Sequence, residues 1–409
     1  MGSSLAWLDN SRDDQQRMRE LIGLFSEKES LDELGIGQVR DAFSDLLFPG
    51  TSSLHTRARY LVIVPWCFQA AERQGRTGVA MTSQVETNER TVIATLKKAG
   101  VSEGLIGSRA GVAVKTLPST IYWTALAKYG IRYGDQAGKW LAQESVANAE
   151  AEELAERPIG MWHPTVPQRP KGFPYDVPGG LDLAESEARW LRDRILAGTA
   201  GSMLAHMLSY GHYPVGDSTA PWEDPAIADA PYEASAILRH AQLFSLAMHG
   251  AALLYNLLIA ERYEREGLTQ VEEPVADYRA RLADWVEDAA NRAGDLATWD
   301  RADMWARVTA QNPRIADNQM MRRFVDGWLD AVANGAAYSA ADDDRLRAAV
   351  GQREKLVKRA QSRLVSERMI RTWSGASGSR RLTFRWPNVR RLVTDIHDGL
   401  GVGTGYAPA

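Results

Sequence analysis

Twenty consecutive residues without a charged side chain, Ala241 to Ala260, constrain the fold of this chain more than any other feature. They lie within residues 235–264, a segment rich in Ala and Leu that contains no proline, as a helix requires. Apolar residues cover nearly every side of this predicted helix, so it has no side suited to solvent. We therefore expect a buried hub helix with other helices packed around it.

The same run is long enough to cross a bilayer, because each helical residue rises by about 1.5 Å. Ser245, His249 and Asn256 are spaced four and seven residues apart and form one polar stripe, and 24% of the chain is charged. We therefore expect a cytoplasmic protein without membrane contact. The stripe is interpreted as a buried polar network that fixes helix register. The alternative is a ligand pocket around His249.

Composition and motifs exclude several classes of site. The net charge is −4, so the molecule as a whole is not a basic nucleic-acid binder. The single cysteine, Cys67, excludes an internal disulfide framework and a Cys-rich zinc site. The chain has neither a GxxxxGK[ST] loop nor an HExxH motif, and its histidines are scattered. We expect no metal and no cofactor.

Residues 87–133 carry the pattern of three short helices, which glycines and a proline at Pro118 divide. Three such helices are the skeleton of a helix-turn-helix or winged-helix unit. In that interpretation Arg109 and Lys115 face DNA. The alternative is a plain three-helix packing unit, and the long connection before Pro118 favours it.

A proline-rich segment suggests the domain boundaries. Six of the 17 prolines fall between Pro158 and Pro178, which excludes regular helix there. We expect a mainly α protein with two helical lobes around the hub helix, including helices capped at Asn10 or Ser11 and over 135–156. The predicted parts are an N-terminal helical domain (1–156), a linker or strap (157–181), a second helical domain (182–350) and a basic C-terminal segment (351–409).

The sign of the charge reverses near the C-terminus. Residues 261–344 hold 18 Asp plus Glu and 10 Arg plus Lys, which gives a net charge of −8. Residues 353–391 hold 12 basic residues and two Glu, which gives a net charge of +10. Basic side chains beside a Gly/Ser-rich loop suit a phosphate backbone. The alternative is that these arginines pair with the acidic stretch upstream. The nucleic-acid hypothesis rests on Arg371, Arg380, Arg381, Arg385, Arg390 and Arg391.

Two further patterns lie in this C-terminal segment. Apolar and polar residues alternate around Thr383 to Trp386, which predicts a small β-hairpin. Arg391 and His397 lie six positions apart on a predicted helix, a spacing similar to the active-site motif of small helical ribonucleases. There, His would act in acid–base cleavage and Arg would steady the phosphate. A His at that position also simply complements the helix C-terminus.

Long phrases of the sequence resemble a bacterial family of uncharacterised proteins. The resemblance covers nearly the whole chain and is carried by LAWLD, DELGIGQVRDAFSDLLFPGTSSLHTRARY, LIGSRAGVAVKTLPSTIYWTALAKYGI, HGAALLYNLLIAE and WSGASG. Such proteins look like components of anti-phage defence islands, encoded near helicases and phospholipase-D-like nucleases. The resemblance brings no catalytic residue with it.

These observations predict a non-enzymatic nucleic-acid-binding or adaptor subunit of a defence assembly, which positions a partner helicase or nuclease. DNA is the favoured nucleic acid. One alternative is a metal-independent helical ribonuclease that uses Arg391 and His397. The other is a structural adaptor that contacts proteins alone.

Overall fold

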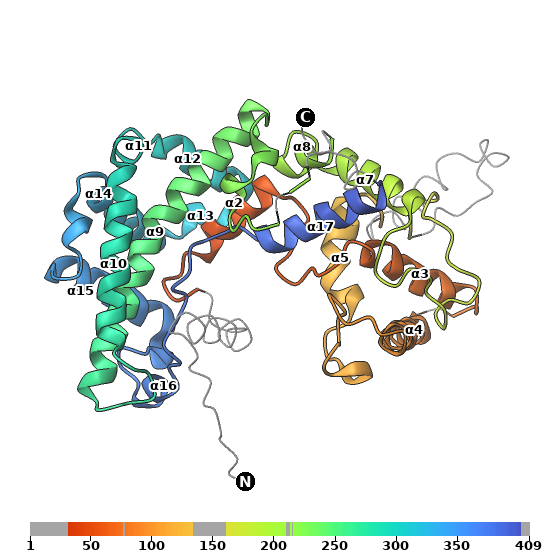
Figure 1. Ribbon diagram of the computed structural model, residues 1–409, viewed down its shortest axis with the longest axis horizontal. Coiled ribbons are helices and arrows are strands. Elements are labelled where there is room, and N and C mark those ends of the chain that lie inside the picture. The colour runs from red at the N-terminus through yellow and green to blue at the C-terminus, as the bar shows by residue number, and fades with distance from the viewer. Residues whose placement is uncertain (1–31, 77, 134–160, 210–212, 215, 402–409) are drawn as a thin grey trace, which may run out of the picture. The chain divides into compact units, whose positions relative to one another are not determined.

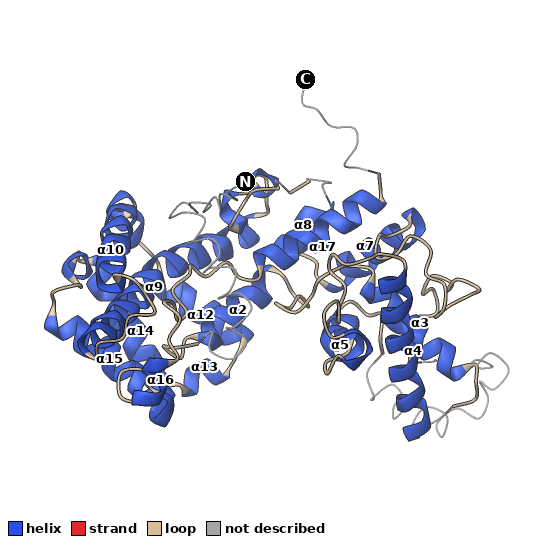
Figure 2. Ribbon diagram, turned by 60° about the horizontal axis from the view of Figure 1, so that its bottom comes forward, coloured by secondary structure: helices blue, strands red, loops and turns tan. Residues whose placement is uncertain are grey.

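The computed structural model describes most of the chain, namely residues 32–76, 78–133, 161–209, 213–214 and 216–401. These residues form helices and loops without a strand, apart from one isolated bridge between Arg132 and Trp162 (Figure 2). The expectation of a mainly α protein is therefore confirmed. The helices predicted from Asn10 or Ser11 and over 135–156 lie outside the described residues.

The chain divides into two compact units. Unit 1 is Met1–Phe43 with Arg239–Leu382, and unit 2 is Ser44–Leu238 with Thr383–Ala409. This division cuts across the predicted domains, because each unit combines segments from distant parts of the sequence. The predicted boundaries relied on local composition. Local composition does not show which distant segments of a chain pack together.

Unit 1 contains helices from the middle and the C-terminal part of the chain. Two helices cross the boundary between units: α2 (Gly37–Leu47) and α9 (Tyr232–Arg265). The others are α10 (Pro274–Asn291), α11 (Ala293–Ala297), α12 (Arg301–Gln311), α13 (Arg314–Asp317), α14 (Gln319–Ala333), η4 (Ala336–Ser339), α15 (Asp344–Lys358), η5 (Arg359–Gln361) and α16 (Glu367–Arg371) (Figure 1).

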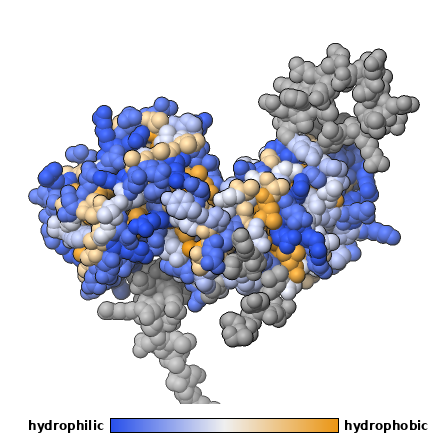
Figure 3. All heavy atoms as spheres, turned by 90° about the horizontal axis from the view of Figure 1, so that it is seen from above, coloured by the Kyte–Doolittle hydropathy of each residue, from blue (hydrophilic) through white to orange (hydrophobic). Residues whose placement is uncertain are grey.

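Helix α9 is buried through its uncharged stretch. By length and composition it could cross a membrane, but 83% of its most apolar window is buried inside the structure, as in the core helix of a globular protein. Trp285 of α10 and Trp328 of α14 are buried against it and donate their indole N–H groups to the carbonyls of Leu246 and Ala247, each at 2.8 Å. The molecular face in Figure 3 is largely hydrophilic, with apolar residues in small patches.

The polar stripe of α9 binds the backbone of residues 377–382. Asn256 Nδ2 donates to Ser377 O at 2.8 Å, and Ser377 N donates to Asn256 Oδ1 at 2.8 Å. The other stripe residues each meet one more carbonyl of this segment: Ser245 Oγ lies 2.8 Å from Leu382 O, and His249 Nε2 lies 3.1 Å from Ser379 O. These contacts favour the network interpretation of the stripe, because each of its three residues bonds a loop of the same unit. Of the polar side-chain atoms in the stripe, only Nδ1 of His249 has no partner among the described residues.

Unit 2 is built on the apolar helix α3 (Tyr60–Glu72), whose residues Tyr60 to Cys67 are all buried. The remaining elements of this unit are α4 (Gly78–Lys98), η1 (Gly111–Ala113), α5 (Pro118–Lys128), α7 (Glu185–Gly198), α8 (Met203–Ser209), η2 (Pro221–Glu223), η3 (Pro225–Ile227) and α17 (Trp386–Gly399). Helix α17 packs on α7 and α8, and α3 packs on α4, α5 and α7.

The second helix of the predicted helix-turn-helix unit does not form. Residues 102–110 are turns, followed by the short η1, and Gly104 and Gly107 have φ of +69° and +82°. Glycine adopts these left-handed values readily, and they interrupt a right-handed helix. A Cβ at Gly104 would also lie 2.5 Å from Cγ of Arg57. The expectation of a helix-turn-helix is therefore wrong in its middle element, and the described residues hold no strand that would make a wing.

The predicted hairpin near Thr383 to Trp386 is also absent from the described segment. Phe384 and Arg385 have φ of +50° and +67°, and α17 begins at Trp386. Phe384 is buried and packs edge-on against Trp222 with their rings 6.3 Å apart. The alternating pattern therefore reflects an irregular turn whose apolar side chains enter the core of unit 2.

The proline-rich segment is a strap within unit 2. Trp66 Nε1 donates to Pro167 O at 2.7 Å, and Arg59 Nη1 donates to Pro178 O at 2.7 Å. Phe173 is buried, with its ring 5.6 Å from that of Trp66. The described part of the segment therefore packs beside α3 within unit 2.

Candidate anion-binding pocket

Several of the predicted nucleic-acid-binding arginines contact the protein itself. Arg385 Nη1 lies 2.7 Å from Asp45 Oδ1 and donates to Thr51 O at 2.7 Å. Arg381 pairs with Asp288, a residue of the acidic stretch upstream. A ligand would have to displace these contacts to reach either guanidinium group.

Two further arginines of the set are engaged along α17. Arg390 Nη1 donates to Ser218 O at 2.6 Å. Arg391 pairs with Glu103 at 2.8 Å and with Asp395 at 3.1 Å. Asp45 and Glu103, which pair with Arg385 and Arg391, come from the N-terminal part of unit 2 rather than from the acidic stretch. These arginines therefore tie distant segments of unit 2 together.

The remaining predicted contacts are exposed. Arg371 lies at the end of α16 and Arg380 in the loop that follows it. Arg109 and Lys115 are exposed between α4 and α5. Because the middle helix of the predicted DNA-binding unit is missing, these last two do not project from a helix-turn-helix.

The pair proposed for ribonuclease chemistry is not arranged around an open site. His397 is completely buried, and its Nε2 lies 3.1 Å from Met207 O. Arg391, on the same helix, is ion-paired as described above. An imidazole without surface exposure does not reach a nucleic-acid strand, so this geometry does not favour the ribonuclease alternative.

His249 likewise serves the interior of unit 1. Burial, helped by the nearby charge of Arg381, lowers its pKa from 6.5 to about 4, so the ring is neutral at pH 7. It lines a space of only about 30 Å³ together with Tyr255 and Arg380. That volume holds about one water molecule and not an organic ligand.

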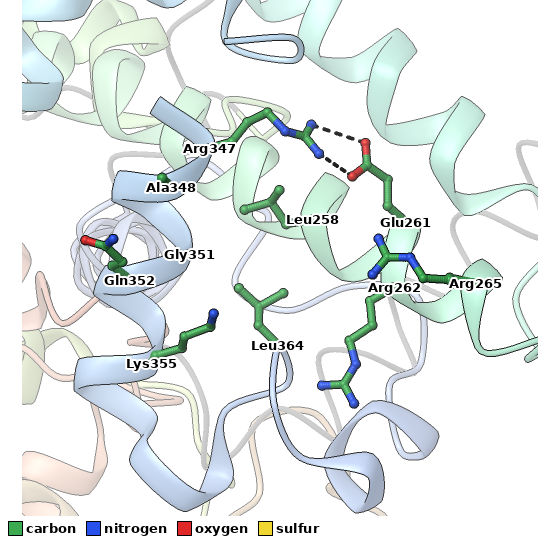
Figure 4. A pocket seen from close by; sticks show the side chains of 10 residues that line it. All are labelled: Leu258, Glu261, Arg262, Arg265, Arg347, Ala348, Gly351, Gln352, Lys355 and Leu364. Atoms are coloured by element: carbon green, nitrogen blue, oxygen red, sulfur yellow. Dashed lines mark hydrogen bonds and ion pairs between the residues drawn. The ribbon is translucent and has the colours of Figure 1, made fainter. Parts of the chain in front are cut away.

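A larger pocket lies in unit 1 between the C-terminal part of α9 and the helix α15. Its volume is about 320 Å³. Four of its ten lining residues are basic, and the lining also contains two leucines and one carboxylate (Figure 4). The lining residues are Leu258, Glu261, Arg262, Arg265, Arg347, Ala348, Gly351, Gln352, Lys355 and Leu364.

Two of the four lining cations are already paired. Arg347 of α15 forms a two-pronged ion pair with Glu261 of α9, which joins the two helices beside Leu258 (Figure 4). Arg262 binds Glu266 at 2.7 Å and donates to Arg363 O at 3.0 Å. These bonds fix both guanidinium groups in the wall of the pocket.

The other two cations are not committed. Arg265 and Lys355 are exposed, and neither side chain forms a hydrogen bond or an ion pair with any residue that the structure describes. Figure 4 shows Lys355 extending from α15 and Arg265 from α9 on the opposite side. Together they leave about two positive charges on the pocket, because Glu261 and Glu266 offset the two paired arginines.

The base of the pocket is apolar and open at Gly351. A Cβ at this position would lie 3.6 Å from Leu364 Cδ1 and 3.8 Å from Leu258 Cδ1, which is ordinary van der Waals contact. Packing therefore does not require glycine here, although glycine in a helix interior costs roughly 1 kcal/mol relative to alanine. The missing side chain leaves room between the two leucines.

This arrangement can hold an anion that carries an apolar or planar part. Exposed Lys and Arg side chains bind phosphate or carboxylate oxygens. The two leucines provide an apolar surface beside them. Among the residues that the structure describes, no group of three or more His, Cys, Asp or Glu side chains could hold a metal ion.

Sequence reasoning missed this pocket, although part of its signal is local. Arg347, Gly351 and Lys355 are spaced by four and therefore share one side of α15. Glu261 and Arg265 follow Leu258 on one side of α9 at spacings of three and four. What the sequence does not reveal is that these two sides face each other.

The helices and the pocket together define a mainly α protein with a basic, partly apolar cleft and no described metal centre. The chain belongs to a family of unknown function, DUF6361, whose model matches residues 2–400. Neither a curated protein nor a solved structure matches the chain.

Proposed function

We propose that the protein is a non-enzymatic nucleic-acid-binding subunit whose phosphate contacts lie on unit 1. The observation that carries this proposal is a group of exposed basic side chains, none of which pairs with a described carboxylate. We call it the basic cluster, and it consists of Arg265, Lys355, Arg359, Arg368 and Arg371.

The members of the basic cluster gather around the C-terminal end of α9. Arg265 is in the last turn of that helix, and Lys355 lines the same pocket. The chain after α15 returns to α9 through the bond from Arg262 to Arg363 O, and Trp373, which follows α16, packs on Tyr263 at 5.3 Å between rings. The segments that carry all five cations are thus anchored to one end of one helix.

Uncommitted cations favour a polyanionic partner. An Arg or Lys that is already paired inside the protein gains little from a phosphate, because the existing pair must first be broken. An exposed unpaired cation can release counterions from a nucleic-acid backbone, which is the main source of sequence-independent affinity. This is why the proposal rests on the basic cluster and no longer on Arg381, Arg385, Arg390 and Arg391.

The wider role follows from the resemblance noted in the sequence. In this proposal the protein is a cytoplasmic subunit of an anti-phage assembly and holds nucleic acid, with DNA favoured, for a partner helicase or phospholipase-D-like nuclease. The acidic surface of residues 261–344 would remain available to a protein partner. If nucleic acid does not bind, that surface makes the structural adaptor the leading alternative.

A binding titration tests the proposal. Fluorescence anisotropy would compare single-stranded DNA, double-stranded DNA and RNA for the wild type and for the Arg368→Ala/Arg371→Ala variant. Wild-type binding that the double substitution weakens about tenfold or more is the expected result, since each lost phosphate contact removes a charge-assisted interaction.

Two comparison variants make the test specific. Arg73→Ala/Lys98→Ala removes the same charge from exposed positions of unit 2 and should leave affinity nearly unchanged. Arg109→Ala/Lys115→Ala tests the original DNA-binding hypothesis for unit 2. If that variant loses binding while the cluster variant retains it, the site on unit 1 is wrong.

A further inference from the structure

We infer that the pocket between α9 and α15 binds a terminal phosphate monoester of a nucleotide, with the attached sugar or base against the leucines. This inference rests on the proposed function, because Arg265 and Lys355 belong both to the pocket and to the basic cluster. The shared chemistry is a phosphate monoester, which either the end of a strand or a free mononucleotide supplies.

Charge is the first argument. A phosphate monoester carries about −1.5 to −2 charges near pH 7, whereas each internal phosphodiester carries one. The pocket offers two uncommitted cations, Arg265 and Lys355, beside two arginines that ion pairs hold in place. The two positive charges of Arg265 and Lys355 therefore match the charge of one phosphate monoester better than that of one internal phosphodiester.

Size and shape are the second argument. The volume of about 320 Å³ lies at the lower end of small-ligand pockets, roughly 300–1,000 Å³. It exceeds what a bare phosphate needs and leaves room for the rest of a nucleotide. The Arg347–Glu261 pair bridges the two helices at one end of the space (Figure 4). A nucleic-acid strand that enters between Arg265 and Lys355 meets this ion pair. The end of a strand therefore fits the pocket more readily than the middle of one.

Gly351 is the third argument. Its position in the interior of α15 is unfavourable for helix stability, and the surrounding contacts would accept a methyl group. The structural consequence of the glycine is an open floor between Leu258 and Leu364. A sugar or base would occupy that floor while its phosphate meets the cations at the rim.

The experiment compares one oligonucleotide sequence with a 5′-phosphate, with a 3′-phosphate and with neither. Anisotropy gives the affinities for the wild type and for Arg265→Ala/Lys355→Ala, and calorimetry with AMP tests the free nucleotide. The expected result is about tenfold tighter binding of at least one phosphorylated oligonucleotide. The double substitution should remove that difference. Both side chains are exposed and unpaired, so the variant should fold.

A second variant, Gly351→Met, fills the pocket without changing its charge. It should abolish the preference for the phosphorylated end and leave the affinity for the unphosphorylated strand unchanged. AMP binding that both variants weaken would assign the site to free nucleotides as well as strand ends.

The outcomes separate the two proposals. Equal binding of all three oligonucleotides, without AMP binding, overturns the terminal-phosphate inference and leaves the nucleic-acid function intact. AMP binding without oligonucleotide binding supports the pocket and overturns the proposed function. If neither AMP nor any oligonucleotide binds, both are wrong.

Discussion

Asn256 and Ser377 hydrogen-bond in both directions: the side-chain amide of Asn256 donates to the carbonyl of Ser377, and the N–H of Ser377 donates to the amide oxygen of Asn256, each at 2.8 Å. Both residues are buried. The pair attaches the Gly/Ser-rich loop to the central helix of unit 1 through backbone groups that would otherwise lack partners.

Replacing Asn256 with alanine should therefore destabilise the protein. Two buried backbone groups of Ser377 lose their partner, and leaving buried groups unsatisfied costs about 1–3 kcal/mol. Ser377→Ala is the matched control, because the bonds use its backbone and its hydroxyl has no partner among the described residues. Urea denaturation should show a large loss for the first variant and little change for the second. Equal losses would contradict this account of the loop.

A second prediction concerns the contact between α9 and α10. A Cβ at Gly250 would lie 2.3 Å from Cζ2 of the buried Trp285, so Gly250→Ala forces the two helices or the indole to move. Overpacking of this kind costs about 1–3 kcal/mol. Gly327→Ala on α14 is the control, since no atom lies within 4 Å of its Cβ position. There we expect a gain of roughly 0.5–1 kcal/mol from helix propensity.

Thermal melting of both glycine variants distinguishes packing from propensity. The melting temperature should fall for Gly250→Ala and stay level or rise for Gly327→Ala. A rise in both would mean that the close approach of Trp285 does not limit this interface.

The stability of the protein should depend on the protonation of Glu89. This carboxyl is buried in unit 2, and burial raises its pKa from 4.5 to about 7 although Ser119 donates to it through N at 2.6 Å and through Oγ at 2.9 Å. The folded state therefore binds the proton more tightly than the unfolded state does. Stability from this group is complete below pH 4.5 and is lost as the pH rises towards 7 and beyond.

Glu89→Gln should remove that pH dependence. A pKa difference from 4.5 to about 7 corresponds to about 3 kcal/mol, since each unit is worth about 1.4 kcal/mol. Urea denaturation at acidic and at slightly alkaline pH should give similar stability for the two proteins in acid. The variant should be more stable above pH 7. A parallel pH profile for both would show that Glu89 is not the titrating group.

The sequence predicts a long buried helix over residues 235–264, because the signal for it is local and strong. Residues 241–260 have no charge and no solvent side, and burial of Phe244, Ala247 and Leu254 follows from that pattern alone. The stripe of Ser245, His249 and Asn256 was also visible as a helical spacing. Its partner, the backbone of residues 377–382, was not, because no local pattern records which loop returns to which helix.

The errors arose where backbone conformation overrode side-chain pattern. Alternating residues near Phe384 look like a strand, but the positive φ of Phe384 and Arg385 makes a turn whose geometry the pairing of Arg385 with Asp45 supports. Gly104 and Gly107 fall inside the second helix that the pattern of residues 87–133 predicts, whereas their positive φ values make this segment a run of turns. In both places the turn lies against a residue distant in sequence: Arg385 pairs with Asp45, and Gly104 lies beside the side chain of Arg57.

The basic C-terminal segment shows the same limit for the candidate site. The net charge of this segment can be counted from the sequence. No local pattern, however, separates Arg385 and Arg391, which pair with Asp45 and Glu103, from Arg368 and Arg371, which have no described partner. Only the fold distinguishes cations that stabilise the protein from cations that remain available to a ligand.

The salt dependence of DNA binding tests the central claim most directly. The affinity of the wild type and of Arg368→Ala/Arg371→Ala for one duplex should be measured over a series of salt concentrations. We predict a steep linear fall of log K with log salt for the wild type, and a slope smaller by about 2 for the variant, because each phosphate contact contributes roughly 0.9. An unchanged slope, or no binding at low salt, would contradict the assignment of the phosphate contacts to unit 1.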